Sequence, residues 1–375
     1  MVSYLRWKAA VAVAVVAVSS LSSVAIAQTW SACNPLYTTC PANPALGMTI
    51  DVEFSQGSVN SFVASGGTPT YDSDGVTFSV GRQGDAPQLI SVFYIMFGRV
   101  EVTMKAAPGA GIVSSLVLQS DTLDEIDMEW LGADSSQVQT NYFGKGQAEP
   151  YNRGQFNPAP NNQAEWITYI IDWTPDRIVW YVGGTAVRTL TYNDANGQYP
   201  QSPMQVKFGA WSGGDPANPP GTIAWAQGPT DYSRGPFPMR VKSALVSDYS
   251  TGKSYSYGDN SGSWQSIRSE GGAINNNNGG SLTVTATAAA DTNQLSPSIP
   301  PGGIGAGQGS TSTQTGWPWT GTGTAAANPI PDGWIMTPEG KIIPASGNMV
   351  KPPHAALLVG PLLLGVLTLV MGRWP

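Results

Sequence analysis

Three carboxylates stand at alternate positions in one short segment of the chain. In the stretch SDTLDEIDMEWLG, residues 120–132, Glu125, Asp127 and Glu129 are separated by single apolar residues. If the segment is a β-strand, its side chains alternate between two faces, so the three acids share one face and the apolar residues share the other. Like charges on one face cost free energy, and this cost predicts that the acids have a chemical use.

The spacing of the acids suits glycosidic bond cleavage. On a strand, Cα atoms four residues apart are separated by ~13 Å, and two Glu side chains that lean inward bring their carboxyls to about 5–6 Å. Retaining glycosidases hold their nucleophile and their general acid about 5–5.5 Å apart. Crowding raises the pKa of one acid, so that it stays protonated beside an ionised neighbour. Asp127 lies between Glu125 and Glu129, where it can hydrogen-bond the nucleophile.

Two structural alternatives to a catalytic cluster stay open. A calcium loop needs oxygen ligands on a turn with a central Gly, whereas DEIDMEW contains no Gly and alternates as a strand does. A solvated strand face more often mixes Thr, Lys and Ser with its acids, although structural acid clusters also have perturbed pKa values.

Few other side chains of the chain could act in catalysis, since it contains one histidine and two cysteines. The sole histidine, His354, lies in a segment that we expect to be removed, which excludes histidine-based triads and histidine metal sites. Cys33 and Cys40 lie close together near the start of the expected mature chain, and in an oxidising compartment they are expected to form a disulfide. Carboxylates must therefore carry any proton transfer, and no metal or other cofactor is expected.

Composition and periodicity predict an all-β catalytic region. From residue 28 to about 272 the chain consists of short alternating runs such as VTFSV, GRVEVTMKA and RIVWYV, broken by Gly, Pro, Asn and Asp. VGGTAV predicts a hairpin through Gly183 and Gly184. Since no segment shows a sustained helical period, we expect a two-sheet sandwich or jelly roll. Residues 273–346, rich in Gly, Ser, Thr and Pro, are expected to form a disordered stalk.

Both ends of the chain have the composition of targeting signals. Residues 1–27 combine basic residues, an apolar run and a small-residue cleavage site, as secretory signal peptides do. Residues 347–375 contain an apolar tail, with Ser346 as the expected site of a glycosylphosphatidylinositol (GPI) anchor; a retained transmembrane helix is the alternative. We therefore expect a secreted protein attached to the outer face of the membrane and the cell wall. With only 11% charged residues and a net charge of -7, it is not expected to bind nucleic acid.

A second segment, MQVKFGAW at residues 204–211, has the composition of a sugar-binding strand. Lys207, Gly209 and Trp211 fall on one face. A Trp offers a flat apolar surface for a sugar ring, Gly leaves room for close approach, and Lys donates hydrogen bonds. The alternative is that Trp211 belongs to the core and that Lys207 is an ordinary surface residue.

The sequence DEIDMEWLG resembles the signature of glycoside hydrolase family 16, whose members have a concanavalin-like β-jelly-roll sandwich. The segments TWSACNPLYTTCP, NYFGKG, WSGGDPANPPGTIAWAQGPTDY and YGDNSGSWQSI narrow the likeness to fungal Crh-type cell-wall transglycosylases, over about residues 28–268. Those enzymes join chitin to β-glucan through a covalent glycosyl-enzyme. The resemblance implies that Glu125 is the nucleophile, Glu129 the general acid/base and Asp127 the assisting carboxylate. The Cys-rich chitin-binding module of some relatives is not found here.

The resemblance also implies which residues contact the sugar. Besides Glu129, it points to Lys207, Trp211 and Thr222, with Tyr142 and Trp225 as further candidates. The expected partners are chitin and β-glucan, and the membrane through the lipid anchor. Two alternatives remain open at this stage, namely a plain chitin or β-glucan hydrolase and a non-catalytic carbohydrate-binding or structural wall protein.

Overall fold

The computed structural model describes residues 31–148 and 152–277, together with the backbone of four short strands at 283–286, 313–314, 334–336 and 342–344. The expected signal peptide, Ser346 and the apolar tail lie outside the described residues. Within the described part of the chain, no helix is long and apolar enough to cross a membrane.

The regular structure is almost entirely β-strand. The strands are β1 (Asn43–Pro44), β2 (Thr49–Glu53), β3 (Phe62–Ser65), β4 (Thr70–Asp72), β5 (Gly75–Val80), β6 (Gln88–Ser91), β7 (Gly98–Lys105), β8 (Ile112–Ser120), β9 (Glu125–Leu131), β10 (Gln137–Phe143), β11 (Gln155–Pro158), β12 (Ile167–Trp173), β13 (Arg177–Val182), β14 (Thr185–Thr191), β15 (Met204–Ser212), β16 (Phe237–Asp248), β17 (Ser254–Tyr257), β18 (Ile267–Ser269), β19 (Thr283–Ala286), β20 (Thr313–Gln314), β21 (Trp334–Met336) and β22 (Ile342–Pro344). The helical elements are short: η1 (Phe54–Gln56), α1 (Pro220–Trp225), η2 (Tyr232–Arg234) and η3 (Trp264–Ser266).

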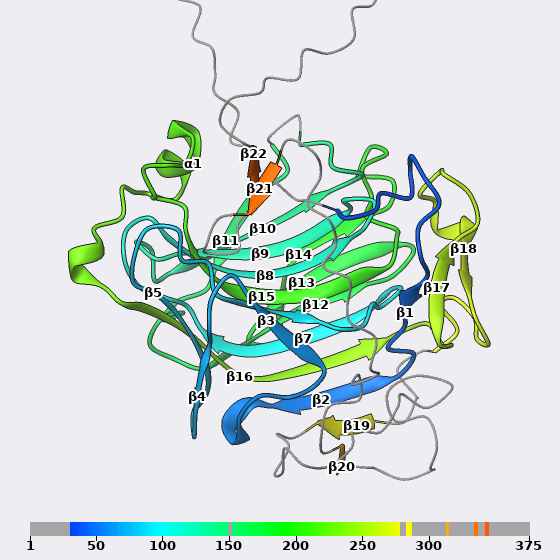
Figure 1. Cartoon of the computed structure of the whole chain (residues 1–375), viewed down its shortest axis with the longest axis horizontal. Helices are drawn as coiled ribbons and strands as arrows, with labels where there is room; N and C mark the ends of the chain where they lie inside the picture. The colour runs from blue at the N-terminus through cyan, green and yellow to red at the C-terminus, as the bar shows by residue number, and fades with distance from the viewer. Residues whose placement is uncertain are drawn as a thin grey trace, which may run out of the picture.

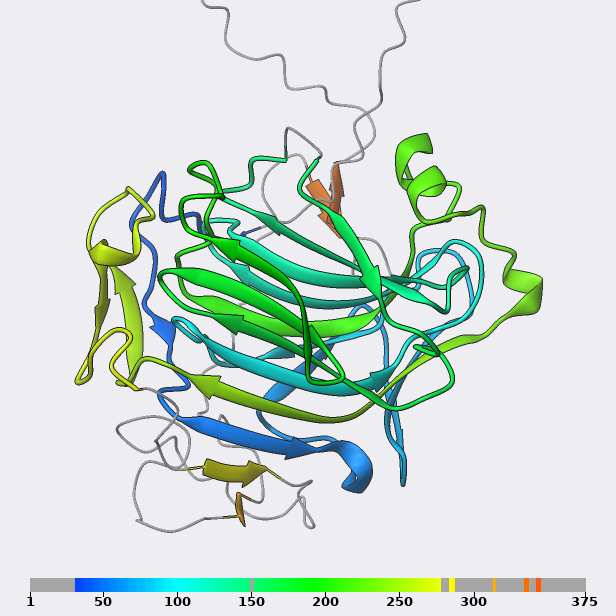
Figure 2. The ribbon, with the colours of Figure 1, turned by 180° about the vertical axis from the view of Figure 1, so that it is seen from behind.

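Two large sheets stack on each other, as the two opposite views in Figures 1 and 2 show. The first has the strand order β11-β10-β9-β8-β15-β6-β3, and all its strand pairs are antiparallel. The second runs β14-β13-β12-β7-β16-β2-β19-β20, with β5 and β4 attached beside β16. Apolar side chains from both sheets form one large buried core. The prediction of an all-β two-sheet sandwich is confirmed.

Alternation within the strands produces this core. Along β7, buried and half-buried residues alternate without exception. In β9, Ile126, Met128 and Trp130 are fully buried on the core side, as their spacing predicted. The predicted hairpin is also present, because Val182 pairs with Thr185 across a turn whose two glycines both have positive φ.

The chain beyond the predicted domain boundary still contacts the sandwich. Asn277 donates to the backbone oxygen of Asp248 at 3.0 Å, and its own N–H bonds Tyr249. Strand β19, from the range predicted to be a stalk, pairs in parallel with β2. An unpaired sheet edge offers free N–H and C=O groups, which explains why a segment of low apolar content can pair there.

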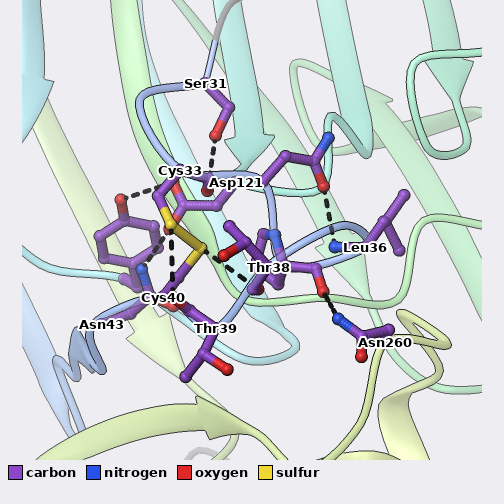
Figure 3. The surroundings of a disulfide bond; sticks show 12 residues. Ser31, Cys33, Leu36, Thr38, Thr39, Cys40, Asn43, Asp121 and Asn260 are labelled. Carbon is purple, nitrogen blue, oxygen red and sulfur yellow. Dashed lines mark hydrogen bonds between the residues drawn. A yellow bond between two sulfur atoms is a disulfide. The ribbon is translucent and has the colours of Figure 1, made fainter.

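The N-terminal loop is closed by a disulfide between Cys33 and Cys40, with an S–S distance of 2.05 Å (Figure 3). The Asn260 side chain donates to the Pro35 oxygen at 2.6 Å and so fastens the loop to the segment before η3. The pairing expected from the two cysteines is therefore the one that the structure contains.

Candidate active site

The three acids lie on the face of the seven-stranded sheet that points away from the core. Antiparallel register places Ser115 of β8 opposite Glu129 and Gln119 of β8 opposite Glu125. Residues that face each other directly across two strands share a face, so these side chains surround the acids. Glu125 and Asp127 are buried, and Glu129 is partly exposed.

Neighbouring strands fix the outer two acids by hydrogen bonds. Gln119 donates its side-chain amide to Glu125 Oε2 at 3.1 Å, and Ser115 donates its hydroxyl to Glu129 Oε1 at the same distance. The indole N–H of Trp211 donates to Ser115 Oγ at 3.1 Å. Each glutamate is thus oriented by its own polar partner from β8.

Asp127 has a different environment, because its partners are the other acids. Its Oδ1 is buried and has no hydrogen-bond partner within residues 31–148 and 152–277. Its side chain is in hydrogen-bonding contact with Glu125. On the core side of the strand, the Trp180 indole donates to the Asp127 backbone oxygen at 3.2 Å, which holds β9 in place from beneath.

Burial and mutual repulsion make the acids titrate in an unusual range. Burial raises the pKa of Glu125 to about 7, against the opposing effects of the Lys207 ammonium and of hydrogen bonds from Asp127 and Gln119. Burial and the charge of Glu125 raise the pKa of Glu129 to about 7 as well. Burial and the charges of Glu129 and Glu125 raise the pKa of Asp127 well above its usual value. Because the three carboxyls interact so closely, they share their protons, and a protonated Asp127 can donate a hydrogen bond to Glu125.

Lys207 lies on the same face as the acids, on β15, but its contact is with Gln119. The Lys207 ammonium donates to the Gln119 side-chain oxygen, and Gln119 in turn donates to Glu125. Burial lowers the pKa of Lys207, whereas the charges of Glu125 and Asp121 act in the opposite direction. The Lys207–Gln119–Glu125 chain thus joins a partly buried cation to the predicted nucleophile.

An open pocket continues the acid face across β8, β15 and β6. Its lining includes Ser115, Val117, Lys207, Gln88 and Trp211. The lining combines hydrogen-bonding groups with an aromatic ring, as sugar sites require.

The room that Gly209 was expected to leave for a sugar is occupied by the protein itself. A Cβ at this position would lie 2.3 Å from the Pro87 oxygen and 2.6 Å from Gln88 Cα. Gly209 therefore permits close approach of β6, and it also lines the open pocket beside the acids, so its contact with a sugar stays a prediction.

Two tryptophans form a wall at the Glu129 end of the acid strand. Trp211 and Trp225 stack with their ring centroids 6.1 Å apart and their planes inclined by 25°. They pack against a small apolar cluster on this face that contains Val113, Leu131 and Ala226. Trp225 is the last residue of α1, which projects beyond the strands (Figure 2). This arrangement brings Trp211 and Trp225 together beside the acids.

The remaining two predicted sugar contacts are Thr222 and Tyr142. Thr222 is buried within α1, three residues before Trp225, and its contact with sugar stays a prediction. Tyr142 is opposite Ile126 in the register, so it points into the core, where it is only 5% exposed. The guanidinium groups of Arg153 and Arg188 lie near its ring. The prediction that Tyr142 contacts substrate is wrong, because its strand turns the opposite face to the acids.

Sequence analysis missed the polar residues that surround the acids. Ser115 and Gln119 lie at the two ends of the apolar run LVL in SSLVLQS, a segment that we used only as an indication of a strand. Gln139 and Asn141 of β10 lie opposite Glu129 and Asp127. Their alternation in QVQTNYF was visible, but their pairing with β9 depends on strand order.

The geometry suits acid and nucleophilic chemistry on an uncharged acetal. An ionised Glu125 and a protonated Glu129 share one face, at which Glu129 is partly exposed, and their pKa values near 7 allow these two states to coexist. Within the described residues, no cluster of three or more His, Cys, Asp or Glu side chains has the arrangement of a metal site.

Known proteins share both this sequence and this structure. The profile of the glycosyl hydrolases family 16 matches residues 54–227. The chain is 56% identical over 358 residues to Crh-like protein 4 of Botryotinia fuckeliana, a match that covers 93% of this chain and 95% of that protein. It is 44% identical to Congo red hypersensitive protein 1 of Saccharomyces cerevisiae, over 69% of this chain and 54% of that protein.

One solved structure is a close match in three dimensions. A Crh5 transglycosylase in complex with NAG superposes with a TM-score of 0.62 at 51% identity, covering 64% of this chain and all of that chain. The likeness in sequence and in three-dimensional structure is consistent with the two-sheet sandwich described above. The chain therefore belongs to the Crh-like proteins of glycosyl hydrolases family 16.

Proposed function

We propose that the protein cleaves chitin by retaining double displacement and transfers the cleaved chain to β-glucan of the cell wall. The observation that carries this proposal is the acid row of β9, in which Glu125 and Glu129, oriented by Gln119 and Ser115, flank Asp127 on one face. Burial raises the pKa of each glutamate to about 7, and burial and the neighbouring charges raise that of Asp127 well above its usual value. Membership of the Crh-like proteins supports the reaction, and the similar Crh5 structure is a transglycosylase complex with NAG, the sugar unit of chitin.

In the first step, Glu129 protonates the oxygen of the glycosidic bond, and that bond breaks as a Glu125 carboxylate oxygen attacks the anomeric carbon. The leaving chain departs with the proton from Glu129. Asp127 donates a hydrogen bond to Glu125 before the attack, and this bond fixes the direction of the nucleophile's free oxygen. A glycosyl ester on Glu125 results.

In the second step, Glu129 is ionised and acts as the base. It takes the proton from an incoming hydroxyl, whose oxygen attacks the anomeric carbon and releases Glu125. If the hydroxyl belongs to a glucan, the product is a hybrid chain; if it belongs to water, the reaction is hydrolysis. The apolar wall of Trp211 and Trp225 beside Glu129 favours a sugar over water, because it offers aromatic surface at the position of the incoming group.

Replacement of the nucleophile tests this proposal. We expect Glu125→Gln to abolish the transfer of labelled chitin oligosaccharide onto glucan, with the melting temperature retained. Glu165→Gln is the matched control, since Glu165 is exposed and bonds only Asn161 within the described residues. Transfer by the Glu125 variant at the wild-type rate would overturn the assignment of the nucleophile. Shorter products alone, with no hybrid chains from the wild-type protein, would identify a hydrolase.

The ends of the chain support a proposal about location. The protein is secreted by means of residues 1–27 and carries a GPI anchor at or near Ser346, which places the enzyme at the outer membrane face and in the wall. Treatment of intact cells with a phosphatidylinositol-specific phospholipase should release it. Retention in the membrane after that treatment, with the apolar tail detected by mass spectrometry, would instead support a transmembrane helix.

A further inference from the structure

The face that carries the acids extends beyond them to the edge of the sheet. Gln139 of β10 lies opposite Glu129, and Phe156 of the edge strand β11 lies opposite Gln139. Directly opposed residues share a face, so Glu129, Gln139 and Phe156 form one row across three strands. Two strand spacings separate the ends of this row, which puts the Phe156 backbone roughly 10 Å from that of Glu129. The pocket described above lies on the other side of the acids, toward β6.

Phe156 is unusual among the phenylalanines of this protein. It is 45% exposed, whereas seven of the other eight are at most 6% exposed and Phe143 is half-buried. Full burial of a Phe side chain stabilises a fold by roughly 1.5–3 kcal/mol, and Phe156 forgoes much of this contribution. A singly exposed apolar residue is ordinary in itself. The position of Phe156, in line with the acids on the same face, is what suggests a use.

Gln139, which forms the floor between Glu129 and Phe156, is held in place by further contacts. The Gln139 side-chain oxygen accepts the Trp225 indole N–H at 3.1 Å, so the aromatic wall and the floor are tied together. Gly154, just before β11, lies so close that a Cβ there would be 3.0 Å from Gln139 Nε2. A polar floor held in one position, bordered by an exposed ring, is the arrangement of a site that orients a polar ligand with an apolar face.

We propose that Phe156 is a sugar-binding platform at the β11 end of the cleft. Its ring takes the C–H face of a β-linked hexopyranose about two rings away from the bond that reacts, while Gln139 lies beneath the sugar between them. This inference rests on the proposed function, since it assumes that the acid row binds a polysaccharide. Pyranose rings present axial C–H groups on one face, which pack on the face of an aromatic ring.

The test is a length series of binding measurements. Calorimetry with the Glu125→Gln protein avoids turnover of the ligand, and the ligands are chitin oligosaccharides and, separately, β-1,3-glucan oligosaccharides of two to eight units. We expect affinity to rise with length until the chain reaches Phe156. In the Phe156→Ala background, the ratio of long-chain to short-chain affinity should fall about two- to twelvefold. Phe156→Trp should retain this ratio, because the aromatic face is kept.

Tyr192→Ala provides the matched control, because Tyr192 is 44% exposed but packs on Tyr199 beside the other sheet. It should leave the length ratio unchanged. If the length ratio falls only with chitin ligands, Phe156 lies on the chitin half of the cleft. If it falls only with glucan ligands, Phe156 lies on the glucan half. Either result supports the platform. An unchanged ratio in Phe156→Ala, or an equal loss for the shortest ligands, overturns it.

The binding assay also separates this inference from the proposed function. If the unmutated chain neither cleaves nor transfers chitin, yet the Phe156-dependent length ratio is found, the proposed function fails and the platform stands. If hybrid chains form but the ratio does not depend on Phe156, the platform fails and the proposed function stands.

Discussion

Replacement of Lys207 by Met gives a sharp test of how the nucleophile is kept ionised. The Lys207 ammonium bonds Gln119, which bonds Glu125, and the positive charge holds the pKa of Glu125 lower than burial alone would set it. Met fills much of the same volume without the charge. The substitution should therefore raise the pKa of Glu125 above its wild-type value of about 7.

The size of the effect follows from the geometry. One amide group and two hydrogen bonds separate the ammonium from the carboxylate, or roughly 7 Å. At an effective dielectric constant of about 20, a unit charge at that separation contributes roughly 2 kcal/mol, or roughly 1.5 pH units. Double displacement requires ionised Glu125, and below its pKa the ionised fraction falls tenfold for each pH unit. At about pH 5.5, kcat/KM should thus fall on the order of 10- to 30-fold.

The assay is the pH profile of kcat/KM for transfer from a chitin oligosaccharide. The acidic limb should move to higher pH in Lys207→Met, while Lys242→Met, which removes an exposed charge from the other sheet, should leave it in place. If Lys207 instead binds sugar directly, as its position on β15 also allows, KM should rise at every pH with no movement of the limb. An acidic limb that coincides with that of Lys242→Met would refute the electrostatic reasoning.

Three further changes have separate readouts. Ser115→Ala removes the hydrogen bond that lowers the pKa of Glu129, so the basic limb of the same profile should move up by about one pH unit while the acidic limb stays. Burial raises the pKa of Asp248 to about 7, so between about pH 4 and pH 7 the folded chain holds a proton that the unfolded chain has released. The free energy of unfolding should therefore fall as pH rises through this range. Asp248→Asn should reduce this slope by up to about 1.4 kcal/mol per pH unit in denaturant titrations. Replacing Cys33 and Cys40 by Ser frees a short loop and should cost roughly 2.5 kcal/mol, measured by thermal unfolding, with transfer activity retained. A large loss of activity would contradict the peripheral place of this loop.

Local alternation was sufficient to predict the strand that carries the acids. Side chains two residues apart on a strand share a face whatever the rest of the fold does, so the common face of Glu125, Asp127 and Glu129 followed from the sequence. The same argument predicted the turn-rich sandwich and the hairpin after β13. These features depend on covalent geometry and on residues close in the chain.

The sequence did not predict the contacts between distant strands. Tyr142 alternates as a strand residue should, but only its pairing with Ile126 shows that it points into the core. Gly209 was correctly expected to permit close approach, yet the neighbour is the backbone of β6, more than a hundred residues earlier in the chain.

The environment of the acids was likewise decided by tertiary structure. The cation that acts on Glu125 reaches it through Gln119, because β15 pairs with β8 and β8 with β9. Strand order and register are set by the burial of all apolar faces together, and no single segment contains that information. The sequence by itself therefore determined which groups can react, whereas the fold determined their neighbours and hence their pKa values.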